Sequence, residues 1–315
     1  MTAAAVLLYF GLVEWLWGWS TLQLAWRQIS PSVLLVALLL LLCSYLLRAL
    51  RLLDLFTLLA WRRLLPALKL ILIHNLLNGL LPLRSGEVSF PLLMASCFSI
   101  PLQRSLPALL WLRLIDLYVV LLLALLALLS TLYPTITSQQ LLLIALVVLL
   151  LPLLLLPLRN QLIVRLVRVD NRPRRWLRRL LEGLPQQVGG MVRLLLWSAA
   201  NWGLKLAVLA WLLAQFLPSL PFAAAWWGAI GGDLTSVLPI HAPAGLGTYE
   251  AGVTAALLPW SVTAAAALPA AVNLHLALLT VMLLGGAIGV LLPGCHALNR
   301  QRLFEGDTPP NPPRS

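Results

Sequence analysis

Residues 81–87, LPLRSGE, and residues 238–250, LPIHAPAGLGTYE, each interrupt an apolar run with proline and glycine. Both segments share one frame, which is Leu-Pro, then a polar or basic residue, then glycine, then glutamate. They lie in opposite halves of the chain. Paired interruptions of this kind in corresponding halves are the best sequence indicator of a transporter's binding site. The pair therefore predicts a membrane protein whose function is centred on the two breaks.

The rest of the chain has the composition of a membrane protein. Of its 315 residues 61% are hydrophobic and only 10% are charged, whereas a soluble domain has about 25% charged residues. The first ten residues, MTAAAVLLYF, lack the basic start of a cleaved signal peptide, so we expect the first apolar run to stay in the mature chain. We expect one integral membrane domain over residues 1–300 and a disordered, proline-rich tail at 301–315.

Apolar segments of about 20 residues predict spanning helices. Six segments meet this length, at about residues 3–26, 32–53, 105–132, 139–158, 190–217 and 262–292. Two pairs of shorter segments flank the breaks, residues 66–81 with 87–100 and residues 222–238 with 244–258. The predicted fold is an all-α polytopic membrane protein with about six full transmembrane helices and two re-entrant, broken-helix hairpins.

The distribution of positive charge predicts the orientation in the membrane. Basic residues gather in residues 54–69, in residues 159–189 and after residue 300, while the loops at 131–140, 218–221 and 259–262 carry no charge. Because cytoplasmic loops are enriched in Lys and Arg, we expect both termini in the cytoplasm. The first half (1–158) and the second half (190–300) then flank an arginine-rich cytoplasmic loop (159–189). On this topology the two hairpins enter from opposite sides, inverted relative to each other, and the halves can rock about the site.

The formal net charge of +12 indicates contact with anionic lipid headgroups rather than with nucleic acid. The basic residues flank membrane segments, and no nucleic-acid-binding motif accompanies them. Cys43, Cys97 and Cys295 are far apart in apolar surroundings, so we expect three separate buried thiols. The histidines and acids are also scattered, so we expect no metal and no cofactor.

Ionisable residues at membrane depth are the candidates for function. A charge at a helix centre costs about 2.5–3.5 kcal/mol, so such residues must pair, meet water or bind a ligand. Six residues qualify, namely Arg84, Glu87, Arg113, Asp116, Asp233 and Glu250.

The first break places Arg84 and Glu87 on either side of a turn at residues 82–86. If a half-helix begins near Gly86, its free N–H groups and the Arg84 guanidinium would together receive a phosphate. Alternatively, Glu87 balances the helix dipole and Arg84 reaches toward lipid headgroups.

Arg113 and Asp116 have i,i+3 spacing, so they share one face of a long helix and can pair locally. Arg113 would then be a second headgroup contact held by Asp116, or the pair would be a structural bridge between helices.

In the second break, Gly245 and Gly247 permit close approach of backbone or positive φ just before Glu250. Glu250 could bind a cationic headgroup, carry a proton, or pair with Arg84 or Arg113. Asp233 and His241 lie near the same turn.

Three motifs, NGLLPLRSGE (78–87), RLIDL (113–117) and PAGLGTYE (243–250), resemble the lysylphosphatidylglycerol synthase transmembrane-region family, which includes the flippase part of the multiple peptide resistance factor. The resemblance covers about residues 5–295. It implies a bacterial or archaeal cytoplasmic membrane protein with broken helices and a role in moving lipids between leaflets. The residues to which the pattern carries over include Asn78, Arg84, Glu87, Arg113, Asp116, Gly245, Gly247 and Glu250.

The expected function is therefore that of a flippase-like lipid transporter without enzymatic activity. Its partners would be lipids with anionic headgroups, together with a second copy of the chain or a lipid-synthesis protein. No ATP-binding loop is visible, so uphill transport would need an ion gradient, with Glu250 as the proton site. Two alternatives stay open: a membrane-embedded enzyme acting on a lipid-linked phosphate or sugar, and a non-catalytic partner of a lipid synthase.

Overall fold

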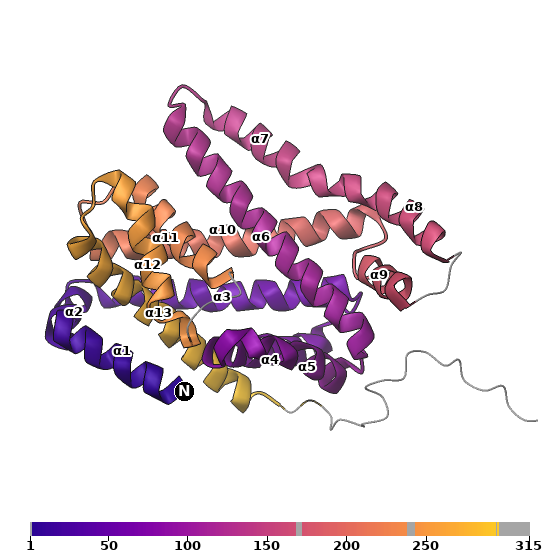
Figure 1. Cartoon of the computed structure of the whole chain (residues 1–315), viewed down its shortest axis with the longest axis horizontal. Helices are drawn as coiled ribbons and strands as arrows, with labels where there is room; N and C mark the ends of the chain where they lie inside the picture. The colour runs from indigo at the N-terminus through magenta and orange to yellow at the C-terminus, as the bar shows by residue number, and fades with distance from the viewer. Residues whose placement is uncertain (1, 168–171, 238–242, 294, 296–315) are drawn as a thin grey trace, which may run out of the picture.

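The computed structural model describes residues 2–167, 172–237, 243–293 and 295, and these residues form only helices, turns and short connections (Figure 1). Within them, five segments are long and apolar enough to cross a bilayer. Three are the single helices α3 (Pro31–Leu55), α6 (Leu102–Leu132) and α10 (Val188–Phe216). The fourth is Ser138–Val164, and the fifth is α13 (Ala264–Leu291). The chain is therefore an all-helical, polytopic membrane protein.

The fourth segment is not one regular helix. It consists of α7 (Ser138–Leu150), the 3-10 turn η2 (Leu151–Leu154) and the first part of α8 (Leu155–Val167). Pro152 explains the turn, because its ring prevents regular α-helical hydrogen bonding at that point.

The expected first span, residues 3–26, is wrong as a single helix. The structure has α1 (Thr2–Leu16) and α2 (Trp19–Arg27), of 15 and 9 residues. They separate at Gly18, whose φ of 72° lies in the left-handed region that favours glycine. The Glu14 carboxylate accepts a hydrogen bond from the Trp19 backbone N–H at 2.9 Å, which stabilises the start of α2. The bend replaces one of the six expected spans with two short helices.

Both predicted breaks form helical hairpins. In the first, α4 (Trp61–Leu80) leads into the 3-10 helix η1 (Pro82–Val88), and α5 (Ser89–Phe98) packs back against α4. In the second, α11 (Phe222–Val237) packs against α12 (Thr248–Leu257), and η3 (Pro243–Gly245) precedes α12. The short turn η4 (Leu258–Trp260) ends α12. The turns η1 and η3 contact each other, so segments from opposite halves of the sequence meet inside the molecule.

Glycines set the close packing of the α11–α12 hairpin. A Cβ added at Gly231 would lie 2.4 Å from the Gly252 carbonyl oxygen, and a Cβ added at Gly252 would lie 2.4 Å from the Gly231 carbonyl oxygen. The two backbones can approach this closely only without side chains, as at other small-residue helix interfaces in membranes.

We expect Gly252→Ala to destabilise the protein by about 1–3 kcal/mol, because the methyl group must push the two backbones apart. The measurement is the unfolding temperature of purified protein in detergent. Gly203→Ala is the matched control, since a Cβ there meets no atom within 4 Å. That control should stabilise α10 by about 0.5–1 kcal/mol through helix propensity alone. Equal unfolding temperatures for the two variants would contradict the packing argument.

The two sequence halves interlock through their helices. Helix α10 of the second half packs along α3 of the first, and α13 of the second half packs along α4 of the first. Gly285, Gly286 and Gly289 of α13 face Leu72 and neighbouring side chains of α4, and an added Cβ would come within about 3 Å of them. The core therefore runs across the boundary between the halves.

The arginine-rich loop contains an amphipathic helix, α9 (Arg172–Glu182). Its C-terminal end is anchored to the bundle, because Leu180 and Leu181 carbonyls accept hydrogen bonds from Trp111 Nε1 at 2.7 Å and Arg159 Nε at 2.8 Å. Residues 168–171 and the tail predicted at 301–315 lie outside the described residues.

The expectation of three separate buried thiols is wrong. Cys97, at the end of α5, and Cys295, after α13, form a disulfide with a Cα–Cα distance of 4.5 Å. Cys43 is a free thiol, but it is exposed on α3. The two cysteines are 198 residues apart in the sequence, so their spacing gives no indication that they are close in space.

Candidate functional site

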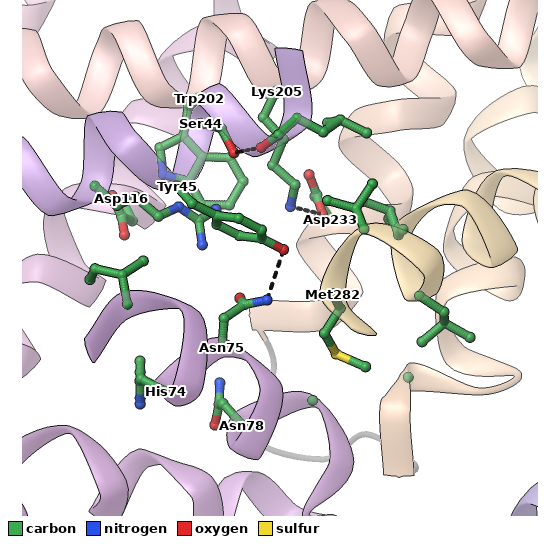
Figure 2. A pocket seen from close by; sticks show the side chains of 18 of the residues that line it. Ser44, Tyr45, His74, Asn75, Asn78, Asp116, Trp202, Lys205, Asp233 and Met282 are labelled. Carbon is green, nitrogen blue, oxygen red and sulfur yellow. Dashed lines mark hydrogen bonds and ion pairs between the residues drawn. The ribbon is translucent and has the colours of Figure 1, made fainter. Parts of the chain in front are cut away.

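A cavity of about 240 Å³ lies among helices α3 to α6 and α10 to α13, together with η3. Its walls are partly polar. Figure 2 shows Tyr45, Trp202 and Lys205 on one side of the space, with His74, Asn75 and Asn78 across from them. The Asn75 side-chain amide donates to the Tyr45 hydroxyl at 2.9 Å across part of this space. Residues from both halves of the sequence therefore line one partly polar cavity.

One ion pair at the cavity wall joins α3 to α6. Arg51 and Asp116 form a two-pronged contact, in which Arg51 Nη2 lies 3.2 Å from Asp116 Oδ2 and Nη1 contacts Oδ1. Arg51 Nη1 also donates to Ser198 Oγ of α10 at 2.7 Å. Both charged residues are 6% exposed. This contact therefore ties three helices together at a buried point.

A second pair joins η1 to α6. Arg113 Nη2 lies 2.7 Å from Glu87 Oε1, and the His74 ring nitrogen Nε2 lies 3.7 Å from Glu87 Oε2. Local pairing of Arg113 with Asp116, which their spacing predicts, is therefore wrong. Asp116 instead pairs with Arg51 of α3, and Arg113 pairs with Glu87 of η1.

A third pair joins α10 to α11, where Lys205 Nζ donates to Asp233 Oδ1 at 2.7 Å. The Lys205 ammonium also lies 4.9 Å from the centre of the Trp202 ring. Arg48, on α3, is placed differently, since its Nε donates to Asn201 Oδ1 at 3.1 Å. Its guanidinium lies 5.6 Å from the Tyr45 ring centre and 5.9 Å from the Trp202 ring centre.

Glu250 lies at a buried junction rather than on the cavity wall. Its Oε1 accepts from the Tyr9 hydroxyl at 2.5 Å and lies 2.8 Å from His275 Nδ1. Its Oε2 accepts from the Gly247 backbone N–H at 2.8 Å, which caps α12. The other His275 ring nitrogen lies 2.9 Å from the Ala244 carbonyl oxygen. Glu250 is 2% exposed and joins α1, α12 and α13. Of its expected roles, pairing with Arg113 is wrong.

The structure brings together half of the predicted site residues. Asn78, Arg113, Asp116 and Gly245 line the cavity. Glu87 stands behind Arg113, and Gly247 is exposed at the start of α12 with a φ of 83°. Arg84 has its backbone in η1, but its side chain lies outside the described part of the chain, as does His241.

Sequence reasoning missed three cations of the cavity: Arg48, Arg51 and Lys205. Both arginines lie near the end of the span expected at residues 32–53, which is where flanking charges are common. In the structure α3 continues to Leu55, about 10 Å beyond Arg48 at 1.5 Å per residue. Lys205 carried a usable signal, since it is a lone lysine inside an apolar span and such residues usually mark a functional site.

Comparison with known protein families identifies the family of this chain. The model described as "Lysylphosphatidylglycerol synthase TM region" matches residues 2–286. The chain belongs to this family. The match confirms the resemblance seen in the three motifs, and it includes every residue that lines the cavity. No curated protein and no solved structure matches the chain.

Family membership and the five apolar spans together make the chain a multi-pass membrane protein of the lysylphosphatidylglycerol synthase transmembrane-region type. In the described residues, no group of three or more His, Cys, Asp or Glu side chains is placed to hold a metal ion. The chemistry of the cavity is instead that of paired charges and aromatic rings.

Proposed function

We propose that this protein moves a lipid with a phosphate-bearing headgroup, of the phospholipid or polyprenyl-phosphate type, between the leaflets of a prokaryotic cytoplasmic membrane. The observation that carries the proposal is the partly polar cavity of about 240 Å³, lined by both sequence halves close to the contact between η1 and η3. Irregular backbone at membrane depth is stable only where protein buries it or a cavity hydrates it. Such a chamber gives a headgroup a polar route through hydrocarbon.

The proposed topology places the basic connectors and both termini in the cytoplasm. It requires α1 and α2 together to make the sixth crossing, because five crossings alone would leave the termini on opposite sides. The α4–α5 hairpin would then be re-entrant from the cytoplasmic side and the α11–α12 hairpin from the outside, as an inverted pair. In Figure 1 the α11–α12 pair lies at the upper left and the α4–α5 pair at the lower centre. Their turns, η1 and η3, are in contact, which supports this arrangement. The headgroup would pass between the two turns while its acyl chains stay in the bilayer.

The Arg113–Glu87 pair would act at this passage. Arg113 lines the cavity and its Nε, buried, has no hydrogen-bond acceptor among the described residues, so it can donate to a phosphate oxygen. Glu87 would hold the guanidinium in place from the other side.

The test is leaflet exchange in liposomes that contain the purified protein and fluorescent lipids of different headgroups. We expect the wild type to exchange a phosphate-bearing lipid, and Arg113→Gln to slow exchange roughly ten-fold or more, as loss of a charged hydrogen bond predicts. Arg63→Gln, which removes an equal charge from an exposed site at the start of α4, should leave exchange unchanged.

Two other outcomes favour the alternatives. Chemical conversion of the lipid would indicate an embedded enzyme. Normal function in cells after Arg113→Gln and Arg84→Ala, combined with loss of function after substitutions in residues 159–189, would indicate a partner of a lipid synthase. Either outcome contradicts the transport proposal.

A further inference from the structure

The cavity holds more positive than negative charge among the described side chains. Four cations line it, and three of them form ion pairs: Arg51 with Asp116, Arg113 with Glu87, and Lys205 with Asp233. Arg48 forms no ion pair within the described part of the chain, and Asn201, which it contacts, is neutral. A cation held away from bulk water without a counter-ion is costly, so the site is suited to one more anion.

Arg48 is held in place but not neutralised. The Tyr45 and Trp202 rings lie on its guanidinium at 5.6 Å and 5.9 Å, and such contacts orient a cation without cancelling its charge. Trp202 also contacts the Lys205 ammonium, at 4.9 Å. One indole ring therefore positions two cations on the same wall of the cavity.

Buried donors without acceptors are also found on the cavity lining. Trp202 Nε1, Arg51 Nε and Arg113 Nε are inaccessible and have no hydrogen-bond acceptor among the described residues. Buried N–H groups are nearly always paired in folded proteins, so donors left unpaired in a chamber indicate an acceptor that comes from outside the chain. In the same lining the acceptor Asn78 Oδ1 has no donor among the described residues, which suits a hydroxyl on the headgroup.

The carboxylates of this region are already engaged. Asp116, Asp233 and Glu87 each contact a cation, and Glu250 is enclosed by Tyr9, His275 and Gly247. An ammonium group entering the cavity would therefore have to share a carboxylate with a cation that is already bound to it. A phosphate oxygen would meet Arg48 without breaking any ion pair.

We propose that Arg48, with Trp202 and Lys205, forms the phosphate receptor of this cavity, and that it selects lipids with a net-anionic headgroup over lipids that carry an ammonium group. The proposal rests on the transport function proposed above. It names the class of lipid that the cavity accepts, and it assigns the receptor to α3 and α10 rather than to the two glutamate-bearing breaks. The apolar side of the same cavity, formed by Leu278, Leu279 and Met282 of α13, would face the glycerol and first methylenes.

The test is equilibrium binding of purified protein in neutral detergent, measured by native mass spectrometry with competing lipids. The probes are phosphatidylglycerol, zwitterionic phosphatidylethanolamine, cationic lysylphosphatidylglycerol and water-soluble glycerol phosphate. We expect phosphatidylglycerol to bind at least ten-fold more tightly than either ammonium-bearing lipid, and Arg48→Gln to weaken its binding roughly ten- to hundred-fold. Arg48→Lys should retain part of the preference, because it keeps the charge but loses the planar contact.

Arg63→Gln is the matched control, since it removes the same charge from an exposed position and should change binding less than two-fold if the effect is local rather than due to net charge. A Trp202→Phe variant keeps an aromatic ring and removes the indole N–H. It therefore tests the contribution of that donor to lipid binding with little loss of packing. Folding of each variant is checked by its elution profile and unfolding temperature.

Four results would overturn the inference: equal binding of anionic and ammonium-bearing lipids, unchanged binding by folded Arg48→Gln and Trp202→Phe, equal loss in the Arg63→Gln control, or equally tight binding of glycerol phosphate without acyl chains. The inference and the transport proposal fail separately. Selective binding without leaflet exchange removes transport and keeps the receptor, whereas exchange that ignores headgroup charge removes the receptor and keeps transport.

Discussion

Replacement of Asp116 by alanine is expected to destabilise the protein by about 3–5 kcal/mol, because it leaves the Arg51 guanidinium buried without its counter-ion. Both residues are 6% exposed, and Arg51 also donates a hydrogen bond to Ser198. The Arg51 guanidinium therefore cannot easily reach water when its counter-ion is removed. The contact joins α3, α6 and α10, and its loss should loosen the bundle at the cavity wall. The measurement is the unfolding temperature in detergent, followed by tryptophan fluorescence and by elution profile.

Two controls separate the buried charge from other effects. The double variant Arg51→Met with Asp116→Leu removes both charges and should recover most of the lost stability, as apolar replacements of buried ion pairs commonly do. Glu182→Ala breaks the exposed pair with Arg178 and should cost only about 0.3–0.5 kcal/mol. Equal losses for Asp116→Ala and Glu182→Ala would contradict the buried pairing.

Replacement of Glu250 by alanine is the second change with a large expected effect, on the order of 3–5 kcal/mol. The carboxylate satisfies the Tyr9 hydroxyl, the Gly247 backbone N–H and a His275 ring nitrogen, and each buried donor left unsatisfied costs about 1–3 kcal/mol. The change also removes the cap of α12 and the polar contact between α1 and that helix. Unfolding temperature again gives the measurement.

Glu250→Gln and Tyr9→Phe are expected to lower the stability less than Glu250→Ala does. Glutamine keeps acceptor capacity and should recover part of the stability, whereas Tyr9→Phe removes one hydroxyl and should cost about 0.5–1.5 kcal/mol. A Glu250→Ala protein as stable as the wild type, but inactive in leaflet exchange, would overturn the structural role and restore the role of this residue as a proton site.

The hairpins were predictable from sequence because proline and glycine act locally. α4 ends before Pro82, where η1 begins, and a Cβ at Gly86 would lie 2.4 Å from Asn78 Cα. The start of a half-helix near Gly86 is wrong, because Gly86 lies inside η1, which continues to Val88, and α5 begins at Ser89. Hairpins that enter the membrane from opposite sides would bring their turns close together, and η1 does contact η3. The bend at Gly18 was missed because a lone glycine in an apolar run is often tolerated within a helix.

The charge partners were not predictable, because they depend on which helices become neighbours. Arg113 and Asp116 satisfy the rule for local pairing, but Glu87 and Arg51 approach them from other elements. Likewise, nothing in the spacing of Tyr9 and Glu250 indicates a contact across 241 positions. Residue type and membrane depth identified candidates for the site, whereas the tertiary arrangement decided which atoms meet.

The interlocked helices also restrict how the proposed carrier can change shape. Because α10 lies along α3 and α13 lies along α4, a rigid hinge between residues 1–158 and 190–300 would have to pull apart two long apolar seams at once. The tips of the two hairpins, at η1 and η3, are attached more locally, through the contact between them and the junctions at Glu87 and Glu250. Sliding of a hairpin tip within a fixed frame is therefore the cheaper motion, and an elevator-like or gate-like displacement suits this architecture better than two swinging lobes.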